Sequence, residues 1–120
     1  MRLSISLSLL QLLTAAAYAQ SSDAVLSGTV TDPGGAVIPK AKILAENART
    51  GVRAETFSNE TGTFVFPALQ PGMYRVTGEA EGFKKLVYND VALEVGARLS
   101  LSVRLEVGAV AESIEVRAEG

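Results

Sequence analysis

Apolar and polar residues alternate along much of the chain, most clearly over residues 99–107. Side chains of a β-strand point alternately to its two faces, so this pattern predicts a strand with one buried face. In a helix the same spacing would spread the apolar residues around the whole circumference. Similar shorter runs predict strands at residues 26–31, 41–46, 52–58, 64–66, 74–80, 86–88 and 91–95.

Glycine, proline and asparagine separate these runs. The sequence Asn-Glu-Thr-Gly at residues 59–62 suits a type I turn closed by a left-handed glycine. From Gly51 onward such breaks recur at roughly 10–14-residue intervals, which is typical of an all-β sandwich. Apart from the first nineteen residues, no stretch has helical periodicity. We therefore predict a seven-stranded Greek-key β-sandwich made of two packed sheets.

The inward positions of the predicted strands define a candidate core. The aromatic and branched aliphatic residues there are expected to have structural rather than ligand-binding roles. The predicted core consists of Val30, Ile43, Phe64, Phe66, Leu69, Tyr74, Val76, Leu101 and Val103.

The first nineteen residues have the pattern of a secretory signal peptide, a helix that is removed on export. Arg2 precedes an apolar stretch, and Ala17 and Ala19 occupy the two positions that a signal peptidase reads, which predicts cleavage before Gln20. A membrane anchor is the alternative, but the stretch is shorter than the ~18–20 apolar residues of a span. We expect an exported chain that does not cross the membrane: signal peptide 1–19, short linker 20–24, sandwich 25–107 and tail 108–120.

The composition argues against several classes of function. The chain has no Cys and no His, which excludes disulfides, thiolate or imidazole metal sites, and catalysis that needs either side chain. Lys plus Arg number 11 against 13 for Asp plus Glu, and the basic residues are spread out, so nucleic acid is not an expected partner. The lysines lie near turns or solvent, where no burial would activate them as bases. We predict no catalytic residue, no metal and no cofactor.

Five motifs occur in order along the predicted sandwich. They are GTVTD at 28–32, GAVIP at 35–39, NETGTFVF at 59–66, LQPGMYRV at 69–76 and AEGF at 80–83. Together they resemble the carboxypeptidase regulatory-like domain, a transthyretin-like (prealbumin-like) sandwich that is also grouped with carbohydrate-binding-like folds. The resemblance covers nearly all of the chain after the signal peptide and implies a non-enzymatic module.

The chain is most similar to the copy of this domain at the N-terminus of Oar-like TonB-dependent outer-membrane receptors, where it precedes a plug and a barrel. Its tail resembles the linker into such a plug. The segment Glu112, Ser113, Ile114, Glu115 and Val116 resembles a TonB box. Its alternating β-branched residues would suit strand addition to a partner's sheet edge. Arg117 departs from the pattern, because the box usually has a small polar residue there. An eighth strand or a frayed terminus is the alternative for this tail.

These observations lead to one function and two alternatives. We expect a non-catalytic periplasmic module of a TonB-dependent receptor system, an N-terminal fragment without plug and barrel, in the periplasm or outer membrane of a Gram-negative bacterium. Its partners would be TonB or a receptor plug and barrel. One alternative is a carbohydrate-binding-like or extracellular adhesion domain, with Phe57, Phe83 and Tyr88 as surface rings for a glycan. The other is an accessory domain of an enzyme.

Overall fold

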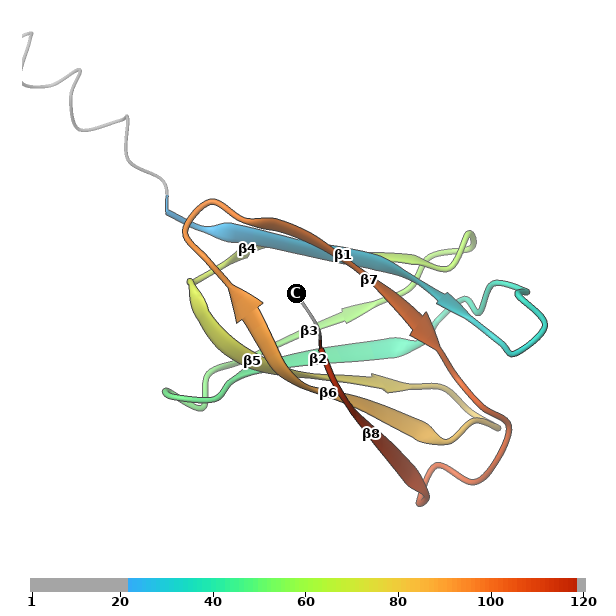
Figure 1. The fold of residues 1–120 in the computed structure, drawn as a ribbon. Coiled ribbons are helices and arrows are strands. Elements are labelled where there is room, and N and C mark those ends of the chain that lie inside the picture. The colour runs from blue at the N-terminus through green and yellow to red at the C-terminus, as the bar shows by residue number, and fades with distance from the viewer. Residues whose placement is uncertain (1–21, 119–120) are drawn as a thin grey trace, which may run out of the picture.

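The computed structural model describes residues 22–118 of the chain. Its regular elements are all β-strands, and they form two layers that face each other (Figure 1). The strands are β1 (Ala24–Thr31), β2 (Lys42–Asn47), β3 (Arg53–Phe57), β4 (Thr63–Leu69), β5 (Gly72–Glu79), β6 (Lys85–Leu93), β7 (Arg98–Arg104) and β8 (Ser113–Arg117).

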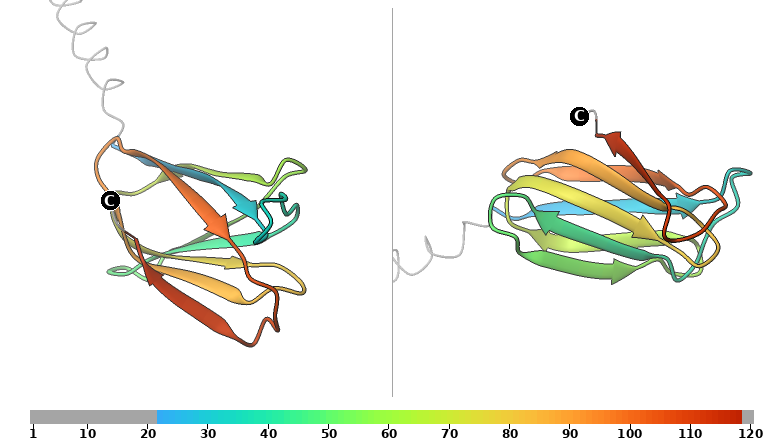
Figure 2. Two further views of the ribbon diagram at one scale, coloured as in Figure 1. Left: turned by 45° about the vertical axis from the view of Figure 1, so that its right-hand side comes forward. Right: turned by 90° about the horizontal axis from the view of Figure 1, so that it is seen from below.

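The strands divide into a sheet of three and a sheet of five. The first sheet has the order β4-β1-β7 and the second has the order β3-β2-β5-β6-β8. Figure 2 shows the two sheets from other sides, with β8 at the margin of the larger one. Two of the pairings, β1 with β7 and β6 with β8, are parallel, and the others are antiparallel. The alternation of residues identifies the buried face of a strand but not the direction of its neighbour.

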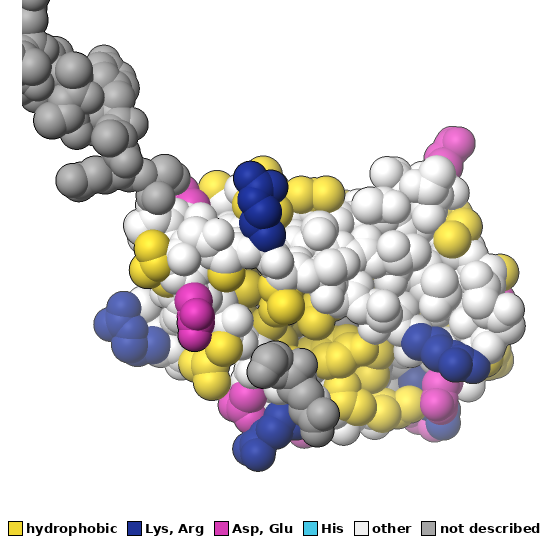
Figure 3. Space-filling view, turned by 45° about the horizontal axis from the view of Figure 1, so that its top comes forward, with side chains coloured by type: hydrophobic (Ala, Val, Ile, Leu, Met, Phe, Trp, Pro, Cys, Tyr) yellow, Lys and Arg dark blue, Asp and Glu magenta, His cyan; other side chains and the backbone are white. Residues whose placement is uncertain are grey.

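The core lies between the sheets and is built from alternate residues of their strands. Buried and exposed positions alternate regularly in β1 and in most of β5, as period-two patterning requires. Partly buried apolar side chains extend the core toward the β7 and β8 edges, and one face of the molecule carries an apolar band with charged groups around it (Figure 3). Eight of the nine predicted core residues are buried, and Leu101 is partly buried and packs against the rest.

A glycine allows close packing in the smaller sheet. Gly28 lies in the central strand β1, opposite Phe64 of β4 and Leu101 of β7. A Cβ atom at this position would stand 2.6 Å from Phe64 Cζ and 2.0 Å from the Leu101 carbonyl oxygen. The Phe64 ring therefore occupies the space that any other residue at position 28 would need.

Residues 22–118 contain eight strands, where seven were predicted for the sandwich. Seven of them lie within residues 24–104, and the tail adds β8. The predicted strands at 86–88 and 91–95 belong largely to one strand, β6. Asn89 and Asp90 stand opposite the single residue Arg75 of β5, and Asp90 has a φ of 58°. This β-bulge puts a polar pair inside a continuous strand, which resembles a turn in the sequence.

The predicted loop at residues 59–62 is confirmed as a turn closed by a left-handed glycine. Gly62 has a φ of 76° and donates its N–H to the Asn59 carbonyl at 2.9 Å. The Asn59 side chain accepts the N–H groups of Thr61 and Thr63. The predicted signal peptide and its cleavage residues Ala17, Ala19 and Gln20 lie outside the described residues. Within residues 22–118, no helix has the length and apolar character needed to cross a membrane.

Candidate functional site

The most distinctive feature outside the core is the edge of the larger sheet, where β8 pairs with β6. The pairing is parallel and runs from Lys85 opposite Ser113 to Asn89 opposite Arg117. Hydrogen bonds from Lys85 N to Glu112 O and from Ala118 N to Asn89 O extend it at both ends. Within residues 22–118, no strand pairs with the other edge of β8. The backbone groups on that side are thus free to meet another chain.

The side chains of β8 that face the core add little buried surface to it. Ile114 stands opposite Leu86 and is partly buried, while Val116 stands opposite Tyr88 and is exposed. No side chain of β8 is fully buried. The hydrophobic contribution of a side chain grows with the apolar area removed from water, so β8 gains little from packing.

Three ion pairs join the β8 segment to the rest of the sheet. Glu112 Oε2 lies 3.6 Å from Lys84 Nζ, and Glu115 Oε1 lies 3.2 Å from Arg75 Nη2. Arg117 Nε donates to Asp90 Oδ2 at 2.9 Å. Because the side chains in these pairs are between 30% and 80% exposed, solvent and salt screen each attraction.

Tyr88 closes the gap between the two sheets beside β8. Its hydroxyl donates to the Ser102 carbonyl of β7 at 2.7 Å. Burial raises the pKa of the Tyr88 phenol. Tyr88, one of the three candidate surface rings, is partly buried in this position.

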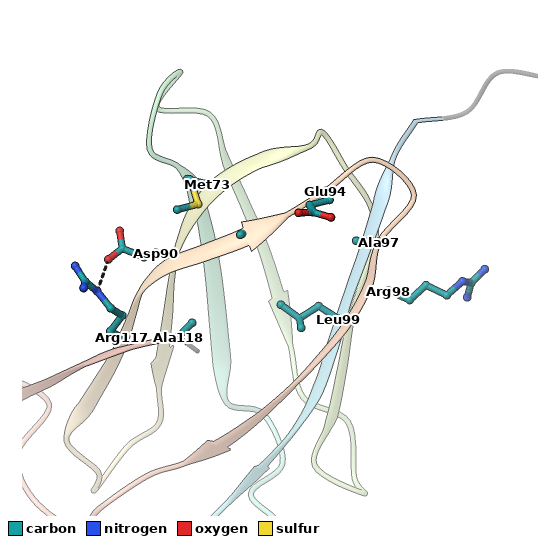
Figure 4. Close-up of a pocket in the computed structure, with 9 residues that line it drawn as sticks. Met73, Asp90, Glu94, Ala97, Arg98, Leu99, Arg117 and Ala118 are labelled. Carbon is teal, nitrogen blue, oxygen red and sulfur yellow. Dashed lines mark hydrogen bonds and ion pairs between the residues drawn. The ribbon is translucent and has the colours of Figure 1, made fainter. Parts of the chain in front are cut away.

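A hollow of about 710 Å³ opens where β8 ends (Figure 4). The parallel pairing runs as far as Asn89 opposite Arg117, and within residues 22–118 no strand pairs with the rest of β6 on this side. The Asp90–Arg117 pair stands at one side of the hollow, and Arg98 points away from that pair. The remaining lining is Met73, Ala92, Glu94, Ala97, Leu99 and Ala118. The hollow thus combines apolar side chains with the Asp90–Arg117 ion pair and the charged groups of Glu94 and Arg98, and its lining has no nucleophile beside a base.

The structure brings the five predicted TonB-box-like residues together at this edge. Ser113 to Val116 lie in β8, and Glu112 immediately precedes it. The tail is therefore an eighth strand, which was the alternative for this segment. The alternation of residues 112–118 indicates an extended strand, but the same pattern suits the chain's own sheet and a partner's sheet equally well.

The other candidate positions are dispersed over the surface. Phe57 is 56% exposed on the edge strand β3, whereas Phe83 is partly buried against the core. Lys42 and Lys85 each lie within 4 Å of a glutamate, Glu55 and Glu79 respectively. Among residues 22–118 there is no group of three or more His, Cys, Asp or Glu side chains that could hold a metal ion.

A sequence comparison identifies the family. A family model of the carboxypeptidase regulatory-like domain matches residues 25–106, more than half of the chain. No curated protein sequence matches the chain.

Several solved structures share the fold. A candidate carbohydrate-binding protein from Bacteroides uniformis is 15% identical with a TM-score of 0.59, over 71% of this chain and 42% of that one. The Bacillus anthracis TIE protein is 16% identical with a TM-score of 0.61, over 72% and 17%. The A72G mutant of Acinetobacter radioresistens catechol 1,2 dioxygenase is 16% identical with a TM-score of 0.57, over 82% and 58%.

These identities establish a common fold and nothing about activity. The chain spans less than two thirds of the length of each of these proteins. The family assignment rests on the match to residues 25–106, which includes nearly all of β1 and the whole of β2 to β7. The chain belongs to the carboxypeptidase regulatory-like domain family.

Proposed function

We propose that this chain is a non-catalytic, exported β-sandwich module of a TonB-dependent outer-membrane receptor system. One observation carries the proposal: the family match ends at residue 106 and is followed by an edge strand, β8, whose outer side pairs with no other strand of residues 22–118. The ordered motifs and the TonB-box-like segment, which resemble the N-terminal part of such receptors, support it. In this role the sandwich folds as a unit and presents residues 112–118 to TonB or to a receptor plug.

Several features support a role without catalysis. The chain has no His and no Cys, so a serine could be activated only by a lysine or a carboxylate. Lys42, Lys84 and Lys85 each pair with a glutamate at a solvent-accessible position. The similarity to catechol dioxygenases is a similarity of fold and transfers no chemistry.

Calorimetry with the chain purified from the periplasm tests the partner. It is titrated with the periplasmic domain of TonB and, separately, with a receptor plug domain. We expect binding to one of them that is lost in the Ile114→Asp/Val116→Asp variant. Val52→Asp is the matched control, because Val52 is exposed and lies outside the strands. If the parent chain binds neither domain, or if the control loses binding as well, the proposal fails.

One observation favours a glycan as a second candidate. Phe57 exposes its ring on the edge strand β3, and exposed rings can serve as stacking platforms for sugars. Affinity electrophoresis against a panel of polysaccharides tests this role. Retardation of the parent chain that disappears in Phe57→Ala would support it, and migration unaffected by every polysaccharide would exclude it.

A further inference from the structure

We infer that the edge of β6 is a binding site for an extended peptide, which this chain fills with its own β8. The occupant is a parallel strand with the β8 pattern: acidic groups at positions 112 and 115, apolar groups at 114 and 116, and a basic group at 117. The same site accepts a separate peptide of that pattern when β8 leaves. This inference does not depend on the proposed receptor role.

The sandwich is complete without β8. The family's domain ends at residue 106, before β8 begins. All sixteen buried residues of the hydrophobic core cluster lie between Ala24 and Leu105. Of the β8 segment, only Ile114 and Ala118 reach that cluster, and both are partly buried. The removal of β8 would therefore leave the core in place and expose the β6 edge.

The β6 edge has a charge pattern that selects one strand in one register. Lys84, Arg75 and Asp90 follow one another along the site and meet Glu112, Glu115 and Arg117 of β8. Two basic side chains and one acidic side chain of the site thus meet, in the same order, two acidic side chains and one basic side chain of β8. A shift by one residue would exchange the two faces of the strand and break all three pairs. Complementary charges fix register and partner choice more than they add affinity.

The receiving strand is held in place by contacts that do not involve β8. Tyr88 bonds to the Ser102 carbonyl of β7, and antiparallel pairing with β5 runs along the length of β6. The site is therefore preorganised, which lowers the cost of binding a strand.

β8 is attached loosely enough to be exchanged. It has no fully buried side chain, and its ion pairs are exposed. The connection from β7 is fixed as far as Gly108, whose N–H bonds to the Gly82 carbonyl, and only a short segment separates it from β8. A tether this short gives β8 a high effective concentration at the site. A separate peptide will therefore bind well only when β8 is weakened.

Fluorescence anisotropy with a labelled peptide of residues 109–118 tests this site. The full chain is compared with its Ile114→Asp/Val116→Asp variant, in which β8 is weakened and the β6 edge is unchanged. We expect the variant to bind the peptide at least ten-fold more tightly than the parent. Equal affinity for both proteins, or no binding to either, overturns the inference. If the variant loses its far-UV strand signal, Glu115→Lys replaces it, because that side chain is exposed.

A charge exchange gives the specific control. In the weakened variant, Arg75→Glu should reduce affinity for the native peptide at least five-fold and restore it for a peptide with Glu115→Arg. If Arg75→Glu weakens binding of the native peptide and the Glu115→Arg peptide does not restore it, the peptide is held by non-specific charge attraction. That result would contradict the proposed binding site. TonB takes no part in either titration, so a failed receptor role and a failed peptide site give separate results.

Discussion

Arg117 donates its Nε hydrogen to Asp90 Oδ2 over 2.9 Å, and this contact joins the last residue of β8 to the bulge of β6. Asp90 therefore belongs to two features: the β-bulge opposite Arg75, where its φ is 58°, and the ion pair with β8. Both residues of this pair line the adjacent hollow.

Substitutions of Asp90 separate its charge from its backbone role. Asn tolerates the left-handed region, so Asp90→Asn removes only an exposed ion pair and should cost less than about 1 kcal/mol. Asp90→Val adds the strain of a β-branched residue at positive φ and should cost about 1–3 kcal/mol more. Urea denaturation measures both. Equal stabilities of the two variants would show that the conformation of Asp90 carries no strain.

Gly28→Ala should destabilise the sandwich strongly. The added methyl group would overlap the Leu101 carbonyl oxygen and the Phe64 ring, so β1 must move away from its neighbours. Overpacking of this kind costs about 1–3 kcal/mol, and more where backbone must shift. Gly34→Ala is the control. A Cβ atom added there would lie 3.4 Å from its nearest neighbour, Asp32 Oδ1, and the φ of Gly34 is not positive. Thermal denaturation with equal midpoints for both variants would contradict the close packing described for β1.

Ser58→Ala should lower stability by about 1–3 kcal/mol. The buried Ser58 hydroxyl donates to the Ile38 carbonyl and accepts the N–H of Ala41, which holds the loop around Lys40. Alanine leaves both backbone groups without this partner. Ser100→Ala, at an exposed position on β7, should change stability by less than about 0.5 kcal/mol. Chemical denaturation that finds Ser58→Ala as mild as Ser100→Ala would refute the role of the hydroxyl.

We expect the free energy of unfolding to fall at alkaline pH because of Tyr88. Burial raises the pKa of its phenol above the ordinary 10.0, so the folded chain keeps a proton that the unfolded chain releases. The resulting stability is complete below pH 10 and is lost as the pH rises through the folded pKa. Absorbance at 295 nm should show a late-ionising tyrosine that is absent from Tyr88→Phe. A variant whose stability falls as steeply above pH 10 as that of the parent would contradict this assignment.

The sequence predicted which face of a strand is buried better than it predicted which strands pair with one another. The alternation at residues 99–107 identified β7 and the buried Val103, because period two reports burial directly. It could not show that β7 pairs in parallel with β1, since either direction gives the same alternation. The bulge was missed because Asn89-Asp90 has the composition of a turn.

The tail shows the same limit at the candidate site. Its alternation identified an extended segment at residues 112–118, and its resemblance to a TonB box suggested strand addition. Pairing within the chain brings the tail's charged side chains to Arg75, Lys84 and Asp90, which lie far from the tail in sequence. No local pattern brings these residues together, so only the fold reveals the complementary edge.

Hydrogen exchange of the full chain tests most directly whether β8 is a separable strand on a complete sandwich. Amides of residues 113–118 should exchange at least ten-fold faster than the core amides of β2 and β5, through local opening that leaves the core intact. Their exchange should quicken in 1 M NaCl, which screens the three ion pairs, while the rates in β2 and β5 stay unchanged. Exchange of residues 113–118 at the core rate, only through global unfolding, would show that β8 is an integral part of the sandwich and contradict this account.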